Sequence, residues 1–165
     1  MSSENPSQKI VFGIPKGSLQ ENSLLFLRKA GFNVHIAPRV CQPKIDDPII
    51  DCFLLRAQEI PKYVALGKLD AGIAATDWIL EQKAIVVEVC DLDFAKRTVG
   101  KCPKWVLAVP QNSPIKSVKD LQGKVISSEV VEITKDYLKK QGVQAKVEFS
   151  WGASEAKAPL FADAV

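Results

Sequence analysis

Short apolar runs alternate with stretches of helical periodicity along most of the chain. Apolar runs bounded by proline, glycine or a charged residue predict buried strands. They cover residues 9–14, 49–55, 105–110, 125–128 and 145–149. Between them, apolar residues recur at helical spacing, and a glycine follows each stretch as a C-cap. These stretches cover residues 18–30, 57–66 and 132–141. The alternation predicts an α/β chain.

Weaker patterns complete this prediction. Residues 34–36 and 84–89 suit strands, and residues 78–83 and 117–121 suit short helices. Residues 69–77 form a strand of small residues, which lets either a ligand or only a neighbouring helix approach closely. Capping residues are expected at the helix starts, with Ser18 and Glu21 as a capping box, Thr76 or Asp77 before residue 78, and Pro159 opening a last helix.

Composition excludes several classes of protein. The 165 residues are 47% hydrophobic, yet no run reaches the roughly 18 apolar residues of a membrane span, and residues 1–9 lack the features of a signal peptide. A cytoplasmic protein without a membrane segment is therefore expected. No C-x-x-C spacing occurs, so we interpret the cysteines, residues 41, 52, 90 and 102, as reduced packing residues. His35, the single histidine, is expected to be a strand residue.

Charge is distributed unevenly along the chain. Residues 1–95 carry 10 Lys/Arg against 12 Asp/Glu, whereas residues 96–165 carry 12 against 7. The positive charges are scattered and not interleaved with aromatic residues, so nucleic acid binding is disfavoured. Residues 96–104 are polar and basic and predict a linker. The expected lobes are residues 1–95 and 105–165, the second of them incomplete at its C-terminal end.

Residues 150–159, Ser-Trp-Gly-Ala-Ser-Glu-Ala-Lys-Ala-Pro, suit a phosphate-binding loop. Gly152 and Ala153 allow backbone N–H groups to approach an anion, and Ser154 adds a hydroxyl donor. A loop of this composition is also common as a plain connection, so its pattern alone leaves both interpretations open.

Other candidate groups follow predicted strands. Lys16, Gly17 and Ser18 stand at the carboxyl end of the first strand, Arg56 at that of residues 49–55, and residues 127–129 at that of a second-lobe strand. Ligands of open α/β sheets bind at this edge. The alternative is that Ser18 only caps a helix and Lys16 is a solvated surface charge.

Several motifs in order resemble the catalytic region of ATP phosphoribosyltransferase. They are Ile14-Pro-Lys-Gly-Ser-Leu-Gln20, Ile45-Asp-Asp-Pro48, Leu69-Asp-Ala-Gly-Ile73, Leu121-Gln-Gly-Lys124 and Phe149-Ser-Trp-Gly-Ala-Ser-Glu155. The resemblance implies a two-lobed α/β fold of the type II periplasmic-binding-protein kind, with a cleft between the lobes. It also implies the first step of histidine biosynthesis, in which the phosphoribosyl group of phosphoribosyl pyrophosphate is transferred to N1 of ATP and pyrophosphate is released.

The same resemblance implies roles for individual residues. Lys16 and Glu129 would be catalytic, and Mg²⁺ would be chelated largely by the diphosphate, without a dedicated protein metal site. The substrate-binding residues would be Gly17, Ser18, Arg56, Asp70, Gly72, Ser127, Ser128, Gly152, Ala153, Ser154, Glu155, Ala156 and Lys157. The family pattern often has arginine at the position of Ser18, and the serine lacks that fixed positive charge.

The family chain ordinarily continues beyond residue 165, so the sequence is expected to be a shortened chain whose own activity is open. Histidine would be a feedback inhibitor only if the parent carries a regulatory domain; other relatives depend on a partner resembling a histidyl-tRNA synthetase. A homo-oligomer is also expected. The alternatives are a small-anion solute-binding domain of the same fold, or a non-catalytic fragment.

Overall fold

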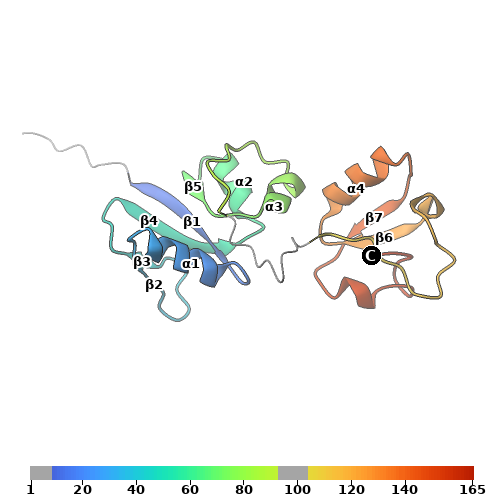
Figure 1. Ribbon diagram of the computed structural model, residues 1–165, viewed down its shortest axis with the longest axis horizontal. Coiled ribbons are helices and arrows are strands. Elements are labelled where there is room, and N and C mark those ends of the chain that lie inside the picture. Colours follow the sequence, from blue (N-terminus) through green and yellow to red (C-terminus); the bar gives the residue numbers. More distant parts are fainter. Residues whose placement is uncertain (1–8, 93–103) are drawn as a thin grey trace, which may run out of the picture. The chain divides into compact units, whose positions relative to one another are not determined.

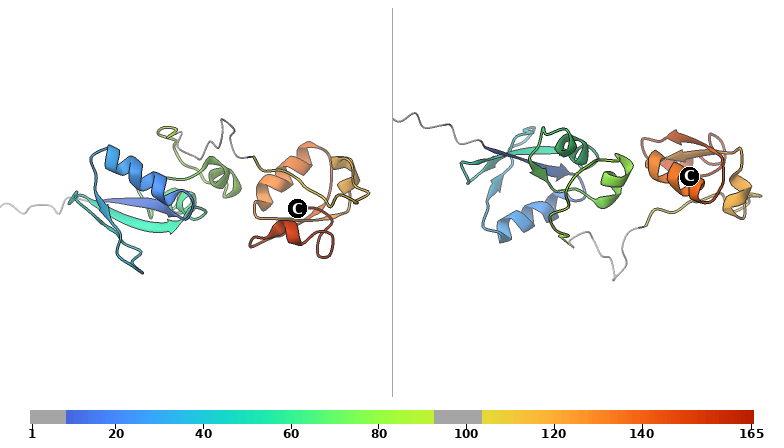
Figure 2. Two further views of the ribbon diagram at one scale, coloured as in Figure 1. Left: turned by 60° about the horizontal axis from the view of Figure 1, so that its bottom comes forward. Right: turned by 90° about the horizontal axis from the view of Figure 1, so that it is seen from above.

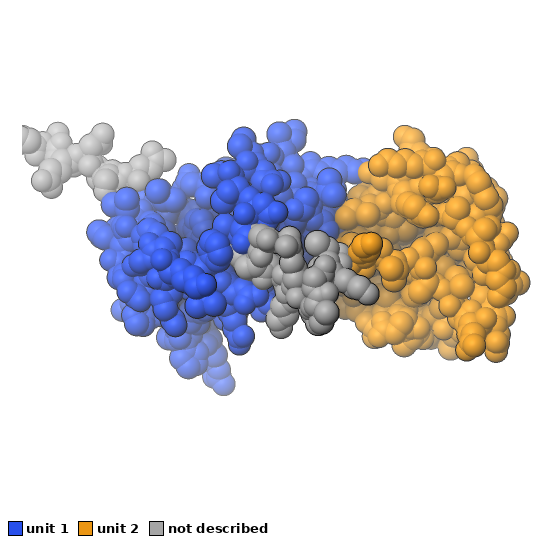
Figure 3. Space-filling model, in the orientation of Figure 1, with its two compact units in different colours: residues 1–102 blue, residues 103–165 orange. Residues whose placement is uncertain are grey.

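The computed structural model describes residues 9–92 and 104–165. The chain divides into two compact units, Met1–Cys102 and Pro103–Val165, each with its own sheet and core. Figure 3 distinguishes the two units by colour. The predicted linker, residues 96–104, lies outside the described residues except for Lys104.

A three-stranded parallel sheet organises the first unit (Figure 1). Strand β1 lies between β4 and β5, and its seven residues pair in register with β4. A second, antiparallel pair joins β2 to β3. The strands are β1 (Ile10–Lys16), β2 (Val34–His35), β3 (Lys44–Ile45), β4 (Ile50–Arg56) and β5 (Ala71–Gly72).

Helices cover both faces of this sheet (Figure 2). On one face, Ile14, Cys52 and Leu54 form the buried core, against which Leu24 and Leu27 of α1 pack. On the other face, Ile60 of α2 packs on the glycines of β1 and β5. The helices are α1 (Gln20–Lys29), α2 (Ile60–Ala65) and α3 (Thr76–Glu81).

The small residues of β5 allow close approach of a helix. A Cβ at Gly72 would lie 2.6 Å from Cγ2 of Ile60 and 3.1 Å from the carbonyl oxygen of Gly13. A real side chain does not fit there, because buried atoms are already close-packed. The sequence pattern left open whether a ligand or a neighbouring helix lies close to this strand. In the structure, helix α2 lies close to it.

A shorter parallel pair, β6 with β7, organises the second unit (Figure 1). Leu138 of α4 packs with Ile126 and Val143 in the core, and Ala164 extends the sheet through a bridge to Ile126. The elements are η2 (Val118–Leu121), β6 (Val125–Ser128), α4 (Val131–Lys140), β7 (Lys146–Phe149) and η3 (Ser154–Ala156).

Several predicted element boundaries were wrong. Helix α1 begins at Gln20 after the N-cap Leu19, which has no side-chain cap, so Ser18 forms no capping box with Glu21. Helix α2 begins at Ile60, and the N-cap of α3 is Ala75, so neither Thr76 nor Asp77 holds that position. Sequence propensity locates the start of a helix only to within a few residues, because the direction in which the preceding chain enters also decides where the first turn forms.

Two predicted strands and one helix are also absent within the described residues. Residues 84–89 and 105–110 carry no strand assignment, although Ala108 exchanges both backbone hydrogen bonds with Val165. Apolar alternation favours a strand, but a strand forms only where a neighbour completes the hydrogen-bond ladder. Pro159 begins no helix, because the chain there turns back to bring Ala162 and Ala164 into the core.

The cysteines also differ from the prediction. Cys52 is a buried packing residue, and burial raises the pKa of its thiol above the usual value. Cys41 and Cys90 are exposed, so the packing interpretation was wrong for them. Cys102 lies outside the described residues. His35 is a strand residue, as predicted.

We expect Gly72→Ala to lower the free energy of unfolding of the first unit by about 1–3 kcal/mol, because the new Cβ would meet a β-branched side chain and backbone. Gly13→Ala is the matched comparison: its nearest obstacle, at 2.8 Å, is the end of the flexible Leu69 side chain, so its cost should be smaller. Urea unfolding of both variants measures the difference. Equal losses would contradict the packing account.

A second prediction concerns Asp163, whose carboxylate accepts a hydrogen bond from the backbone N–H of Val125 at 2.9 Å. This bond is the main cause of a pKa below the usual value, and the ammonium of Lys124 adds to it. A lowered folded-state pKa stabilises the fold above the unfolded value, about 3.9, and that stabilisation is lost as the pH falls through the folded value.

Asp163→Asn should therefore destabilise the second unit by a constant amount between about pH 5 and 8, and the difference from wild type should shrink below about pH 4. NMR-detected urea unfolding of the second unit measures it. Asp136→Asn, an exposed carboxylate of α4, is the control. A difference that persists unchanged to pH 3 would rule out this role of the charge.

Candidate functional site

The carboxyl edge of the first sheet carries several cations. Lys16 ends β1 and Arg56 ends β4, and the two are register partners in the parallel pair. Parallel pairing therefore places both side chains at one edge, where ligands of α/β sheets bind. The structure brings these two predicted site residues together.

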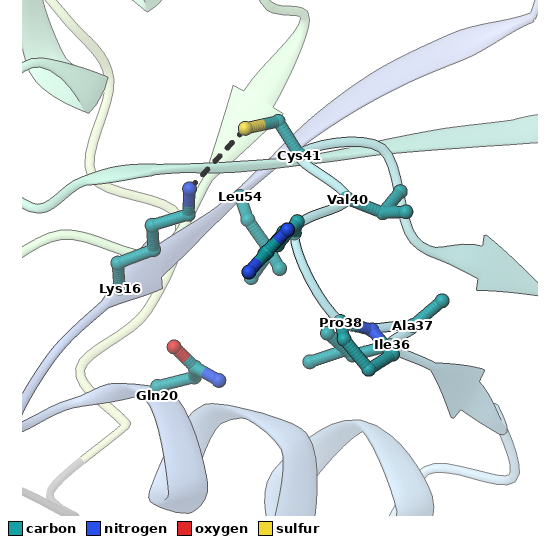
Figure 4. A pocket seen from close by; sticks show the side chains of 9 residues that line it. Lys16, Gln20, Ile36, Ala37, Pro38, Val40, Cys41 and Leu54 are labelled. Carbon is teal, nitrogen blue, oxygen red and sulfur yellow. Dashed lines mark hydrogen bonds between the residues drawn. The ribbon is translucent and has the colours of Figure 1, made fainter.

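A cavity of about 390 Å³ opens beside Lys16. Figure 4 shows the Lys16 side chain reaching from β1 toward Cys41, whose sulfur accepts a hydrogen bond from Nζ at 3.3 Å. Gln20, at the start of α1, also lines the cavity. The remaining lining residues are Ile36, Ala37, Pro38, Arg39, Val40 and Leu54.

Arg39 is a site residue that sequence reasoning missed. It lies in the irregular segment between β2 and β3, and its φ of 62° is in the left-handed region. The sequence shows a positively charged residue in this segment. Only the pairing of β2 with β3 brings Arg39 to the cavity beside Lys16. Among residues 9–92 and 104–165, no carboxylate forms an ion pair with Lys16, Arg39 or Arg56.

The turn after β1 depends on Gly17. Its φ of 91° lies in the left-handed region, which is strained for a residue with a side chain. Space is not the reason for a glycine here, because an added Cβ would meet nothing within 4 Å. Gly17 is thus required for the conformation of the turn, which its carbonyl closes by accepting a hydrogen bond from the N–H of Gln20 at 3.0 Å. Ser18 lies in this turn and is exposed.

The structure does not bring Asp70 to this edge. Its carboxylate accepts a hydrogen bond from the N–H of Val11 at 2.8 Å, at the amino end of β1. Val11 lies five strand positions from Lys16, which corresponds to about 16 Å. Gly72, in turn, faces Ile60 of α2. These contacts give Asp70 and Gly72 structural roles, and their contacts with substrate stay predictions.

Asp46 and Asp47 of the Ile45–Pro48 motif also have structural roles. Asp46 accepts hydrogen bonds from the backbone N–H and the side-chain amide of Asn33, at 2.9 and 2.7 Å. The backbone bond is the main reason why its pKa lies below the usual value. Asp47 accepts a hydrogen bond from the N–H of Ile49 at 2.9 Å.

In the second unit, the ends of β6 and β7 lie side by side. Ser127 and Ser128 are buried at the end of β6, and the N–H of Ser150 donates to the carbonyl of Ser128 at 2.9 Å. The Ser128 hydroxyl contacts that of Thr134 at 2.9 Å and accepts from the N–H of Val130, so it holds the start of α4. Ser128 thus connects the sheet to the helix.

The predicted phosphate loop follows β7 directly. Gly152 and Ala153 have positive φ values of 116° and 48°, and Ser154–Ala156 then form the short helix η3. Glu129 lies against the loop, because its Oε1 would be 3.6 Å from a Cβ at Gly152. The structure thus brings together the predicted residues 127–129 and 152–157.

The loop contains a connected set of polar side chains. The hydroxyl of Ser150, fully buried, lies 2.8 Å from that of Ser154 and accepts a hydrogen bond from Nζ of Lys157 at 2.6 Å. A hydroxyl and an ammonium at one loop are donors suited to a phosphate.

Metal ligands do not gather at either part of the site. Within the described ranges, no group of three His, Cys, Asp or Glu side chains stands close enough to hold a metal ion. Nor does any described helix have the length and apolar character needed to cross a membrane.

Comparison with known proteins identifies the family. A sequence model of HisG, ATP phosphoribosyltransferase, matches residues 56–165. The chain is 55% identical over 154 residues to the ATP phosphoribosyltransferase of Thermodesulfovibrio yellowstonii, covering 93% of this chain and 52% of the relative. It is 50% identical over 161 residues to the ATP phosphoribosyltransferase of Chlorobaculum parvum, which covers 98% of this chain and 54% of that relative. The chain thus spans about half the length of these relatives.

A solved structure shows the same fold. The ATP phosphoribosyl transferase (HisG:HisZ) complex from Thermotoga maritima matches with a TM-score of 0.72 and 22% identity, over 94% of this chain and 70% of that chain. The predicted α/β fold of the periplasmic-binding-protein type is confirmed. Together with the family model, these relatives show that the chain belongs to the ATP phosphoribosyltransferase family.

Proposed function

We propose that this chain is part of an enzyme that transfers the phosphoribosyl group of phosphoribosyl pyrophosphate to N1 of ATP, the first step of histidine biosynthesis. The observation that carries the proposal is the loop Gly152–Lys157, where a serine hydroxyl, a lysine ammonium and left-handed backbone stand beside Glu129. Family membership favours this transfer over a solute-binding role.

The chemistry requires few catalytic groups. Adenine N1 has a free lone pair, so it can attack C1 of the ribose without a general base while the bond from C1 to the diphosphate oxygen breaks. The electron pair of that bond leaves with the pyrophosphate. Catalysis then consists of alignment and of stabilising the charge on the leaving group.

We assign the cations of the first unit to the nucleotide and the diphosphate. Lys16, Arg39 and Arg56 form no ion pairs with described carboxylates, so their charge is available to a polyphosphate. Gly17 and Ser18 would support this contact through the turn after β1. Arginine can bind phosphate oxygens in a bidentate manner, whereas lysine acts as a point charge.

We assign the loop of the second unit to the 5′-phosphate and ribose of phosphoribosyl pyrophosphate. Residues 127, 128 and 152–157 would surround the sugar phosphate, with Glu129 as the carboxylate nearest the reacting carbon. A carboxylate there can stabilise positive charge that develops on the ribose as the leaving group departs.

Mg²⁺ fits this arrangement as a companion of the diphosphate. It is usually held by substrate phosphates with one or two carboxylates, and Glu129 is a carboxylate that lies beside the loop. When bound, the ion would neutralise charge on the leaving diphosphate. Such an activity implies a cytoplasmic enzyme, and assembly as a homo-oligomer remains part of the proposal.

Lys16→Met tests the role of the first unit. Because the substitution removes a cation from the polyphosphate site, we expect kcat/KM for phosphoribosyl-ATP formation to fall at least about tenfold. Mass spectrometry of the product measures the rate. Lys44→Met, an exposed lysine of β3 outside the cavity, should change it less than twofold. If both variants behave alike, Lys16 lies outside the site.

Glu129→Gln tests the carboxylate at the loop. The amide keeps the size and loses the charge, so kcat should fall at least about tenfold while the KM for ATP changes little. Glu132→Gln, a carboxylate in the first turn of α4, is the matched control. An unchanged kcat in the Glu129 variant would exclude a role for that charge in the reaction.

A further inference from the structure

Arg39 has a backbone conformation that arginine seldom adopts. Its φ of 62° lies in the left-handed region, and it follows Pro38 in a turn that the N–H of Val40 closes on the carbonyl of Ala37 at 3.3 Å. Proline at the second position and a positive φ at the third are the pattern of a type II turn, in which glycine is favoured at the third position. An arginine in this place costs conformational free energy, so its side chain needs an explanation.

Contacts within the chain do not explain this arginine. Arg39 is exposed and lines the cavity beside Lys16, and its guanidinium forms no hydrogen bond or ion pair with any residue in the ranges 9–92 and 104–165. An exposed cation without a partner adds little to stability, so nothing in the folded chain offsets the strained backbone. The guanidinium is therefore placed for a ligand of opposite charge.

Arg39 stands in an arm, which we define as residues 33–46. The arm consists of β2, β3 and the irregular residues 36–43 between them. Strands β2 and β3 are two residues long and pair only with each other. A two-stranded ladder this short is marginal by itself, so other contacts must hold the arm in place.

Asn33 and Asp46 close the base of the arm. The Asp46 carboxylate accepts hydrogen bonds from the backbone N–H of Asn33 at 2.9 Å and from its side-chain amide at 2.7 Å. The N–H of Asp46 donates in return to the carbonyl of Asn33 at 3.2 Å. Both carboxylate oxygens are engaged, and hydrogen bonds to a charged acceptor are stronger than neutral ones. We call this pair the clamp.

The other end of the irregular segment is attached to the sheet. The carbonyl of Cys41 accepts a hydrogen bond from the N–H of Leu54 in β4 at 2.7 Å, and its sulfur accepts from Lys16 at 3.3 Å (Figure 4). The arm is thus fixed both at its base and beside Arg39. A segment held at two points has fewer conformations, so the guanidinium occupies a narrow range of positions.

We propose that Asp46 is a positioning residue: its clamp on Asn33 keeps the arm closed and thereby presents the guanidinium of Arg39 to the polyphosphate of a nucleotide. This assignment rests on the proposed function, which gives Arg39 that contact. A group that is ordered before the ligand arrives binds it more tightly, because less conformational entropy is lost on binding. The alternative is a clamp that only stabilises the first unit, without acting through Arg39.

The first measurement needs no ligand and follows the hydrogen exchange of two backbone amides by NMR. The N–H of Leu54 reports the attachment of the arm, whereas the N–H of Ile73, which donates to Gly13, reports the stability of the sheet itself. Asp46→Ala should speed exchange at Leu54 at least about fivefold and leave Ile73 within about twofold. Equal acceleration at both amides, or none at Leu54, would overturn the proposal.

The second measurement is calorimetric titration of the full chain with inorganic tripolyphosphate, which isolates the phosphate contacts from those of adenine. Asp46→Ala should weaken binding at least about threefold. Asp46→Asn should stay within about twofold of wild type, because its amide oxygen still accepts from the N–H of Asn33. Asp51→Ala, which removes an exposed ion pair with Lys9, is the control. Equal losses in Asp46→Ala and Asp51→Ala would refute a specific role of the clamp.

A double-mutant cycle shows whether the clamp acts through Arg39. Arg39→Met should weaken tripolyphosphate binding at least about fivefold, and adding Asp46→Ala should cause less than about a further 1.5-fold loss, because the positioned group is gone. Independent losses that multiply would contradict positioning through Arg39.

Arg39→Gly separates binding from stability. It should weaken tripolyphosphate binding as much as Arg39→Met does, without lowering the midpoint of urea unfolding, because glycine adopts a positive φ without strain. A lower midpoint would show that the arginine side chain stabilises the fold and would overturn its assignment to a ligand.

Failure of the proposed function would look different. Coupled losses of tripolyphosphate binding in a chain that forms no phosphoribosyl-ATP would refute the transferase and retain the positioning role. Unchanged tripolyphosphate affinity and unchanged kcat/KM in Asp46→Ala would overturn the positioning role and leave the proposed function intact. If Asp46→Ala does not fold, Asn33→Ala replaces it, since it removes only the side-chain donor of the clamp. Unchanged affinity in that variant would likewise overturn the proposal.

Discussion

Parallel pairing of adjacent strands is the constraint on which the candidate site depends. Parallel strands end at the same edge of a sheet, so whatever follows each of them is brought together. In the first unit the pairing of β1 with β4 aligns Lys16 with Arg56. In the second, the pairing of β6 with β7 puts Glu129 beside the loop at Gly152. One backbone rule thus assembles both groups of residues.

Packing on the opposite side of the first sheet explains how that edge is kept in place. Gly13 and Gly72 have no side chains, so Ile60 of α2 lies directly on the strands. Strand β5 pairs with only Phe12 and Gly13, which leaves Pro15 beyond its reach. A proline lacks the backbone N–H that a strand with neighbours on both sides must donate. At Pro15 no strand lies on the β5 side, so no N–H is needed there. The predicted end of the strand at Pro15 was therefore too early, and Lys16 is itself a strand residue.

In the second unit, residues 163–165 anchor the chain that follows the loop Gly152–Lys157. Asp163 accepts from Val125, Ala164 pairs with Ile126, and Val165 exchanges hydrogen bonds with Ala108. These contacts return the chain to β6 after the loop. A helix from Pro159 onward would point its backbone groups along its own axis and could not make them. The loop therefore relies on side chains such as Ser150 and Lys157 for its polar contacts.

The sequence by itself determined the α/β class, the strands before the two candidate loops, the family motifs and most of the cationic or hydroxyl-bearing residues near them. Apolar periodicity and glycine punctuation are local properties, so they can be interpreted without a partner. Only the tertiary structure placed Asp70 at the amino end of β1, assigned Gly72 to packing and brought Arg39 to the cavity. It also left residues 84–89 without a strand assignment and connected Ser150 to Lys157. These features depend on which distant segments meet, and that is decided by hydrogen-bond pairing and close packing between segments, which no local pattern encodes.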